Sequence, residues 1–591
     1  MDYSQEVVTS LLWILKTLAI TTVTFSLGIF LLVRFTHWGT QFWMFAGGYL
    51  TLKRSVKPIL FFLLIVTMTL FSVRLSLVHS EWYKNMYTSL QEFNQPVFWE
   101  QMILFCFIAA FAVSASLISY YLEQRFCIDW IDWLNNELVN KWMSHRAYYK
   151  TQYMSANLDN PDQRIQQDIL SYVKTTLGLS TGVIDAVTSM VSYTILLWGL
   201  TGPMVVFDFE IPHMMVFLVF GYVIFTTLIA FWLGRPLIKL NFINERLNAN
   251  YRYSLIRIKE YAESIAFYVG EKAEKSLLYK QFRSVINNMW DIVYQTLKFS
   301  GFNLIVSQIS VVFPLLIQVG RYFEKQIKLG DLMQTLQVFG KLHSNLSFFR
   351  NTYDNFAGYK ATLDRLTGFV AAIEMSEKQS KAHIHYHDSD VIFSGLSINN
   401  PFGKTLIKDL NLTLPQGASL LITGKSGSGK TTLLRTAAGL WSYSTGQVYC
   451  PEKALFLSQK TYLPQGDLLT ALAYPDAAES VDKALVLETL RLVQLGHLCD
   501  RIEQQNDWTR ILSLGEQQRL AFARLLLQRP KVAFLDEATA SMDEGLEEAM
   551  YRLIRERLPN MTLISVGHRS TLKTFHYQQL RILEDGAWSL T

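Results

Sequence analysis

A glycine-rich turn followed by a lysine and a hydroxyl residue is the strongest chemical signal in this chain. An apolar run from Leu421 leads into Gly424-x-x-x-x-Gly429-Lys430-Thr431, and a helix-prone run follows. In this strand–loop–helix setting the glycines let backbone N–H groups wrap a phosphate chain, and the helix N-terminus adds positive potential. We expect Lys430 to reach the β- and γ-phosphates and the Thr431 hydroxyl to ligate Mg²⁺. The predicted nucleotide contacts are Gly424, Lys425, Ser426, Gly427, Ser428, Gly429, Lys430, Thr431 and Thr432.

Acidic and polar residues further along the chain complete a phosphoryl-transfer pattern. The apolar run 532–535 ends in Asp536-Glu537, and His568 follows a second apolar run, Thr562–Val566. We expect Asp536 to hold Mg²⁺ through water and Glu537 to polarise the attacking water, because positioning and electrostatics supply most of this catalysis. Taken alone, Glu537 could be a helix-start charge and His568 could be structural. Their neighbourhood favours the catalytic interpretation and places His568 at the γ-phosphate.

The order of these motifs resembles that of the nucleotide-binding domain of ABC transporters, from Val391 to the C-terminus. The resemblance implies ATP and Mg²⁺ as cofactors and ATP hydrolysis as the activity. It makes Gln459 a Q-loop residue, catalytic and Mg²⁺-binding. Ser513-Leu-Gly-Glu-Gln517 matches the family signature except that Leu514 replaces a glycine, and Ala540–Asp543 matches the D-loop. The resemblance therefore adds Ser513, Gly515, Glu516 and Asp543 to the nucleotide contacts.

Two further signals near the start of this domain have open or plain interpretations. Many relatives stack adenine on an aromatic residue, for which Phe402 is the nearest candidate, although it could equally anchor a turn. His383, His385 and His387 alternate, a spacing that favours one face of a short strand over a metal site. In the ABC transporters that this chain resembles, the signature of one subunit closes over the glycine-rich turn (the Walker A motif) of another. A single ATPase domain therefore implies a homodimer.

Long apolar stretches in the first 350 residues predict a membrane domain. A helix of about 20 apolar residues spans the hydrocarbon core. Stretches of this kind are Leu11–Val33, Pro58–Leu77, Met102–Leu122, Gly182–Gly202, Met214–Gly234 and Phe302–Gly320. A seventh, Leu332–Phe349, is more polar, as a helix lining a water-filled path can be. The first stretch is preceded by acidic residues and lacks a clear cleavage site, so we expect a retained helix.

Charge and spacing predict orientation and domain limits. The segment Arg34–Lys57 is basic without acids and falls inside, whereas Ser80–Glu100 is acidic on balance and falls outside. The long gaps between spans three and four and between five and six fit the two cytosolic extensions of an exporter-type ABC fold. The predicted organisation is an extra N-terminal helix with its connection at 1–56, a helical membrane domain of six core helices at 57–373, a linker at 374–390 and an α/β P-loop ATPase domain at 391–591.

Further segments in both halves resemble the SbmA/BacA–YddA group, which is similar to the peroxisomal fatty-acyl transporters. The segments are Tyr148–Gln152, Asn160–Ile165, Tyr261–Glu271, Tyr322–Lys325, Leu329–Gln334, Phe456–Pro464 and Tyr474–Asp476. This resemblance implies a homodimeric half-transporter of the bacterial inner membrane, multi-pass, with its ATPase domain cytoplasmic. It also implies uptake of bulky hydrophilic solutes such as cobalamin or peptides.

Other functions remain as alternatives. The same scaffold could export lipids, drugs or acyl compounds. A polar cavity would favour uptake of hydrophilic solutes, and an apolar cavity would favour export. An ATP-regulated receptor or channel would often lack Glu537 or His568, and the spans exclude a soluble ABC ATPase. Asp185 lies in a predicted span and is a candidate for a substrate or proton role, or is simply solvated. The net charge of +5 does not indicate nucleic acid as a partner.

Overall fold

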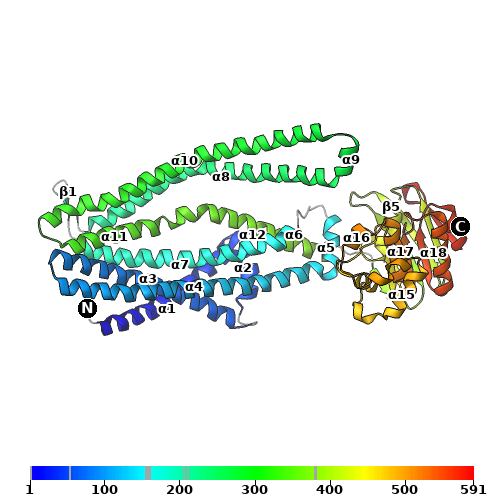
Figure 1. Cartoon of the computed structure of the whole chain (residues 1–591), viewed down its shortest axis with the longest axis horizontal. Coiled ribbons are helices and arrows are strands. Elements are labelled where there is room, and N and C mark those ends of the chain that lie inside the picture. Colours follow the sequence, from blue (N-terminus) through cyan, green and yellow to red (C-terminus); the bar gives the residue numbers. More distant parts are fainter. Residues whose placement is uncertain are drawn as a thin grey trace. The chain divides into compact units, whose positions relative to one another are not determined.

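The computed structural model describes residues 3–51, 55–153, 161–201, 204–206, 209–211, 213–378 and 383–591. The chain forms two compact units (Figure 1). The helical unit comprises Met1–Leu138 and Asn160–Thr367, and the ATPase unit comprises Val139–Asp159 and Gly368–Thr591. The segment that follows Leu138 therefore belongs to the ATPase unit, although it lies within the predicted membrane domain.

Ten longer or connecting helices make up the first part of the chain. They are α1 (Tyr3–Phe35), α2 (His37–Tyr49), α3 (Lys57–Gln91), α4 (Gln95–Met143), α7 (Ile169–Leu200), α8 (Met214–Glu260), α9 (Ala262–Phe267), α10 (Glu271–Phe323), α11 (Leu329–Leu346) and α12 (Phe348–Lys378). Short helical turns between α4 and α7 include α5 (Ala147–Lys150) and α6 (Pro161–Gln163). A hairpin of β1 (Met204–Val206) and β2 (Phe209–Ile211) precedes α8. Residues 52–54 of the predicted basic segment and 202 of the fourth span lie outside the described residues.

Six helices within the described ranges are long and apolar enough to cross a membrane, and they contain the first six predicted spans except for the last two residues of the fourth. The seventh predicted span differs from this pattern. It forms α11 and the beginning of α12, but α11 does not meet the same criterion of composition. The reason is its polar interior face, on which Gln334 and Thr335 are buried. The Gln334 amide nitrogen lies 3.3 Å from the backbone oxygen of Ser80 in α3 and 3.2 Å from Glu81.

The helical unit is organised around α3, α7 and α11. Val338, Phe339 and Leu342 of α11 are fully buried against apolar residues of α7 and α8. At the start of α7, the buried carboxylate of Asp168 lies 3.0 Å from Arg164 and 2.6 Å from Arg365 of α12. A buried carboxylate is expensive unless it is paired, so this double ion pair stabilises the α7–α12 contact.

Two helices extend well beyond the thickness of a bilayer. The α8 helix has 47 residues and α10 has 53. At a rise of 1.5 Å per residue, each is about 70–80 Å long, against about 30 Å of hydrocarbon. They run side by side and are joined at one end by α9 (Figure 1). The long gap between spans five and six is therefore a helical hairpin.

The ATPase unit contains two sheets. The larger sheet has the strand order β12-β11-β6-β10-β9-β8. The strands β11, β6, β10, β9 and β8 are mutually parallel, and β12 is antiparallel to β11. Its strands are β6 (Ser419–Gly424), β8 (Ala454–Leu457), β9 (Val532–Asp536), β10 (Thr562–Val566), β11 (Gln578–Ile582) and β12 (Trp588–Leu590). The smaller sheet has the order β3-β7-β4-β5, from β3 (His383–Tyr386), β4 (Val391–Asn399), β5 (Thr405–Leu414) and β7 (Ser444–Cys450).

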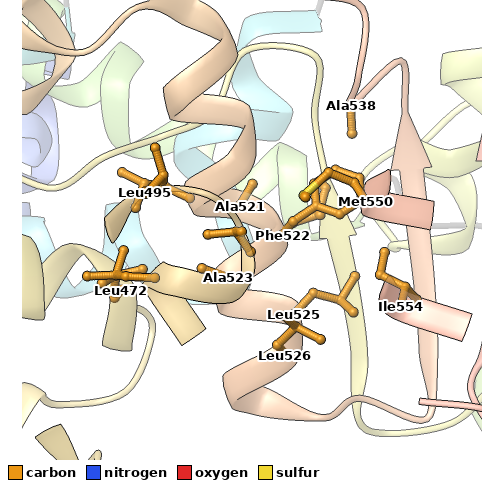
Figure 2. Packing of buried hydrophobic residues seen from close by; sticks show 14 of the residues in the cluster. Leu472, Leu495, Ala521, Phe522, Ala523, Leu525, Leu526, Ala538, Met550 and Ile554 are labelled. Carbon is orange, nitrogen blue, oxygen red and sulfur yellow. The ribbon is translucent and has the colours of Figure 1, made fainter. Parts of the chain in front are cut away.

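Helices cover the larger sheet and supply its core. They are α13 (Lys430–Ala437), α14 (Leu468–Ala473), α15 (Lys483–Leu492), α16 (Trp508–Ile511), α17 (Leu514–Gln528) and α18 (Glu544–Arg557). Figure 2 shows that α17 lies at the centre of this packing, where Phe522 and Leu525 meet Met550 and Ile554 of α18. These side chains are at most 1% exposed, so α17 is held firmly and presents its N-terminus in a defined position.

The predicted linker contains regular structure at both ends. The α12 helix continues to Lys378, because Phe369, Val370 and Ile373 bury its apolar face, and β3 occupies 383–386. Residues 379–382 lie outside the described residues. The alternating histidines begin in a strand, as predicted for His383 and His385, and His387 follows it. The His385 ring stacks on Tyr449 of β7 at 5.0 Å.

Candidate functional site

The residues predicted to do chemistry follow the carboxyl ends of four neighbouring parallel strands. The glycine-rich turn follows β6, His568 follows β10, Asp536 and Glu537 end β9, and Gln459 follows β8. Adjacent parallel strands bring their carboxyl ends to one edge of a sheet, where α/β proteins bind ligands. The fold therefore gathers residues that are far apart in the sequence.

The glycine-rich turn has the backbone of a phosphate cradle. Gly427 and Gly429 have φ angles of 78° and 102°, which favour glycine. A Cβ atom at Gly424 would lie 2.7 Å from the backbone oxygen of Ile582. The Ser428 hydroxyl oxygen is buried and has no hydrogen-bond partner within the described part of the chain. These features fit a bound phosphate chain, whose oxygens would accept hydrogen bonds from the backbone N–H groups and the Ser428 hydroxyl.

A cavity of about 910 Å³ lies beside this turn. The predicted residues that line it are Gly424, Lys425, Ser426, Gly427, Ser428 and His568. Sequence reasoning missed Lys404, Lys573 and Arg581, which also line it and add positive charge. Only the outward position of Arg581 in the alternating pattern of β11 could have indicated one of them.

Lys430 and Thr431 open α13 on the inner side of the turn. The Lys430 ammonium donates to the backbone oxygens of Gly424 and Lys425 at 2.9 and 3.0 Å, so it is held inside the loop. The Thr431 hydroxyl lies 3.1 Å from Asp536, which belongs to the neighbouring strand-end. Burial raises the pKa of Asp536, and the hydrogen bond from Thr431 partly offsets this. A hydroxyl and a carboxylate at this distance are oxygen ligands of the kind that Mg²⁺ prefers.

Glu537 and His568 face each other across the ends of β9 and β10. The distance from the His568 Nε2 atom to the Glu537 carboxylate is 3.6 Å. Glu537 has a φ of 49°, an unusual conformation for a residue other than glycine, and its N–H donates to the backbone oxygen of Val566. Strained backbone of this kind is concentrated at functional sites. The structure thus brings together two of the three residues to which we assigned catalysis.

The signature residues form a helix start rather than part of this cavity. Ser513 caps α17: its hydroxyl accepts from the backbone N–H of Glu516, and the Glu516 carboxylate accepts from the Ser513 backbone N–H at 2.9 Å. Burial favours the neutral acid, but the hydrogen bonds from Ser513 outweigh it and lower the pKa of Glu516. Gly515 lies in the first turn of α17 and Asp543 caps α18. Within one chain these residues do not line the cavity beside the glycine-rich turn.

Gln459 and Phe402 also lie outside the lining of this cavity. Both side chains are exposed, and Phe402 is 94% exposed. Phe402 sits in a turn that the Asn400 side chain closes by accepting from the backbone N–H groups of Phe402 and Lys404. This geometry matches the turn interpretation of Phe402, while its exposed ring is available to a ligand.

A buried glutamine connects three of the predicted motifs and was missed. Gln518 of α17 donates to the backbone oxygen of Gln459 at 3.1 Å and accepts from the backbone N–H of Ser541 at 3.0 Å. It is 2% exposed. Signature helix, Q-loop and D-loop therefore share one side chain. In the sequence, only the position of Gln518 directly after the signature could have indicated its role.

Arg569, next to His568, was also missed. Its guanidinium donates to the backbone oxygens of Met542 and Ala540 at 2.8 and 3.3 Å. Glu547, 2% exposed, lies 3.7 Å from Arg569 and accepts from the Thr571 hydroxyl. These contacts tie the histidine-bearing loop to the D-loop.

The segment between α4 and residue 153 packs within the ATPase unit. The Tyr153 ring lies 5.2 Å from Trp441 and 5.7 Å from the Arg435 guanidinium. Its backbone oxygen accepts from the Tyr443 hydroxyl at 3.0 Å. Arg146 donates to the backbone oxygen of Ala438, at the end of α13. The helix that begins at the glycine-rich turn thus ends against a segment that continues from a membrane helix.

Comparison with known proteins gives consistent matches over both halves. Residues 48–323 match the family described as ABC transporter transmembrane region 2, and residues 407–540 match the family described as ABC transporter. A Haemophilus influenzae protein named as an uncharacterized ABC transporter ATP-binding protein is 76% identical over the whole of both chains. The inner membrane ABC transporter ATP-binding protein YddA of Escherichia coli is 31% identical, over 88% of this chain and 92% of its own. The human lysosomal cobalamin transporter ABCD4 is 28% identical, over 78% of this chain and 81% of its own.

Proposed function

Because this chain belongs to the ABC transporter family, in which ATP hydrolysis drives transport across a membrane, we propose that it works as a homodimer that takes up bulky hydrophilic solutes such as cobalamin or peptides. The similarity to YddA and ABCD4 places it among ABCD-type half-transporters. The resemblance to the SbmA/BacA–YddA group and the basic segment after α1 support a bacterial inner membrane location with the ATPase domain in the cytoplasm.

In this proposal the residues beside the glycine-rich turn hold ATP and Mg²⁺. Gly424 to Thr432 supply backbone N–H groups and the Lys430 ammonium to the phosphates, and Thr431, Asp536 and Gln459 supply oxygen ligands. Bound Mg²⁺ would neutralise charge on the β- and γ-phosphates. Glu537 would orient the attacking water and accept its proton, and His568, 3.6 Å away, would hold Glu537 in place and contact the γ-phosphate.

Two features support dimerisation. Ser513, Gly515 and Glu516 do not line the cavity beside the glycine-rich turn of their own chain, and the family resemblance implies that a second copy supplies them. The α8–α9–α10 hairpin also leaves apolar side chains uncovered at its end, where Phe267, Tyr268 and Val269 are 79%, 86% and 77% exposed. Apolar clusters that lie beyond the hydrocarbon mark interaction sites.

A polar cavity in the helical unit supports the proposal that the cargo is hydrophilic. It has a volume of about 540 Å³ and lies between α3, α4 and α11. Its lining includes the ionisable side chains of His79, Glu123 and Lys341. Lipids or drugs would leave these groups without polar partners, which is costly.

A second cavity supports the alternative function, export of lipids or acyl compounds. It has a volume of about 380 Å³ and is lined mainly by apolar residues of α1, α2, α7 and α12, among them Phe25, Trp38, Phe42 and Val183. We favour uptake because the polar cavity is larger and contains charges that an apolar cargo would not use.

The test is uptake of radiolabelled cobalamin by cells that lack other uptake routes. The wild-type chain is compared with Glu537→Gln at equal membrane abundance. Uptake that the substitution abolishes would establish ATP-driven import. Absence of uptake in both would reject cobalamin, and the assay is then repeated with labelled peptides. Energy-dependent loss of a preloaded acyl compound from the same cells would instead support export.

A further inference from the structure

The polar cavity of the helical unit contains charges of both signs that do not pair with each other. Glu123 belongs to α4 and Lys341 to α11, and both line the cavity. The Glu123 carboxylate accepts one hydrogen bond, from Ser119 at 3.2 Å. Within the described part of the chain, the Lys341 ammonium forms neither a hydrogen bond nor an ion pair. An acid and a base share one cavity and leave their charges available.

Specific contacts between α3 and α4 hold the cavity wall around these charges in place. His79 of α3 stacks on Trp82 at 5.1 Å, and the Trp82 indole donates to the backbone oxygen of Gln101 in α4 at 2.7 Å. Phe105 of α4 stacks on the same indole at 4.8 Å. These contacts hold α3 and α4 together at one end of the cavity and keep the His79 ring in its wall.

A third polar group points to a missing partner. The side-chain oxygen of Gln337, one turn before Lys341 on α11, is buried and lacks a hydrogen-bond partner among the described residues. A buried carbonyl oxygen without a donor costs about 1–3 kcal/mol. A ligand with N–H groups in this cavity would satisfy it.

Charge within or next to membrane spans is also expensive and usually serves a function. Asp185 of α7 lies near enough for Lys341 to act on it electrostatically, and Lys341 acts on His79 in the same way. The Asp185 carboxylate does not line the cavity. The negative charge of Asp185 therefore stabilises the Lys341 ammonium electrostatically, and the ammonium remains available to bind an anion.

We infer that this cavity binds a small zwitterionic solute of the amino-acid or short-peptide class, with its carboxylate at Lys341, its ammonium at Glu123 and an amide N–H at Gln337. The inference rests on the proposed transport function and narrows its cargo. A volume of about 540 Å³ accommodates a short peptide, since ligand cavities commonly measure 300–1,000 Å³. A solute with only one charge would leave the other group uncompensated.

The experiment measures binding of four peptides to the full chain in lipid nanodiscs by calorimetry. The probes are trialanine, N-acetyl-trialanine, trialanine amide and N-acetyl-trialanine amide, which differ only in their end charges. We expect trialanine to bind about tenfold more tightly than either singly blocked peptide, because each block removes one charge-assisted contact.

Two substitutions assign the contacts. Lys341→Met should remove the preference for a free carboxylate and keep the preference for a free amine, and Glu123→Gln should do the reverse. The comparison is made between peptides on one protein sample, so a partly damaged preparation still reports its own selectivity. Lys16→Met on α1 and Asp129→Asn on α4 lie outside the cavity lining and should retain both preferences.

Equal affinity for all four peptides, no binding of any of them, or variants that keep both preferences would overturn the inference. ATP hydrolysis by the same nanodiscs is measured in parallel. One outcome is that Glu537→Gln abolishes hydrolysis but the wild-type chain shows no selectivity among the peptides. This outcome would reject the zwitterion site and would not contradict the proposed transport function. Absence of hydrolysis in the wild-type chain would instead count against the proposed function, whatever the peptides do.

Discussion

The hydroxyl oxygen of Thr431 lies 3.1 Å from a carboxylate oxygen of Asp536, although 105 residues separate the two in the chain. Thr431 opens the helix after β6, and Asp536 ends β9, with β10 between these strands in the sheet. Because burial raises the pKa of Asp536, the carboxylate gains from a nearby cation. We therefore propose this pair as the Mg²⁺ position of the site.

Replacing Glu537 should stop turnover without preventing ATP binding. The substitution Glu537→Gln removes the base that positions water, and general-base catalysis typically contributes about 10²–10⁴-fold. The glycine-rich turn is untouched, so ATP affinity should stay unchanged. The measurement is steady-state phosphate release together with equilibrium nucleotide binding. The matched control Glu544→Gln, at the start of α18, should hydrolyse ATP normally, and full activity of Glu537→Gln would refute the assignment.

Replacing Lys430 should weaken nucleotide binding itself. Its ammonium is held in the loop by two backbone oxygens, where it can reach phosphates. A hydrogen bond to a charged group contributes about 1.5–3 kcal/mol, so Lys430→Ala should lower ATP affinity by roughly 10- to 100-fold. Nucleotide titration of the purified chain measures this. Lys453→Ala, on the surface before β8, serves as the control, and unchanged affinity in Lys430→Ala would reject the cradle.

Gln518 should matter for turnover more than for ATP affinity. Gln518→Met keeps the length of the side chain but leaves the Gln459 carbonyl and the Ser541 N–H without their partner. We expect hydrolysis to fall at least tenfold, and the ATPase unit to lose about 1–3 kcal/mol of stability, because buried polar groups lose hydrogen bonds. Hydrolysis rates and thermal unfolding distinguish the two effects. A variant with normal hydrolysis would show that the bridge is structural only.

Tyr153 should couple transport to hydrolysis. Tyr153→Ala removes the ring that packs on Trp441 and Arg435, in a segment that continues from a membrane helix. Solute uptake should fall strongly while ATP hydrolysis continues, since no residue of the glycine-rich turn is altered. Uptake and hydrolysis are measured in the same proteoliposomes. Tyr148→Ala, from the same segment but with an exposed ring, should transport normally. Parallel loss of both activities in Tyr153→Ala would contradict coupling.

His576 should make the ATPase unit sensitive to acid. Burial lowers the pKa of His576 to about 4, and its Nδ1 donates to the Leu572 carbonyl while Nε2 faces the Ser565 hydroxyl at 2.9 Å. With a folded pKa below the unfolded value of 6.5, the stabilisation is complete above pH 6.5 and is lost as the pH falls toward about 4. The loss amounts to about 3 kcal/mol at most.

Hydrogen exchange of the β10 amides, corrected for intrinsic exchange rates, measures this loss. Protection should decline from pH 6.5 downward in the wild-type chain. His576→Gln, which retains a donor and an acceptor but does not titrate, should show a flatter profile. Equal pH profiles of the two chains would reject the assignment to His576.

The motifs of the ATPase unit could be predicted from sequence because each depends on local geometry. A glycine-rich turn before a helix, or an acidic pair ending an apolar strand, has the same local form wherever it occurs. The confirmed prediction of six apolar helices has the same basis, since hydrocarbon thickness sets helix length. The polar seventh span was less predictable, because the amide nitrogen of its Gln334 donates to Ser80 and Glu81, which are remote in sequence.

The residues that connect the motifs could not be predicted from sequence. Gln518 and Arg569 act by reaching backbone groups on other loops, and nothing in their local sequence specifies those partners. The cavity charges of the helical unit are of the same kind. Glu123 and Lys341 are ordinary residues in sequence, and only the packing of α3, α4 and α11 makes them face one space.

The sequence by itself determined the class of this protein, its proposed ATP-site residues and its apolar helices, because these depend on short-range spacing and on hydrophobicity. Tertiary structure alone decided that Thr431 meets Asp536, that Glu537 meets His568, and that Tyr153 packs within the ATPase unit. Strand order brings distant chain segments to the same sheet edge, and burial there raises the pKa of Asp536.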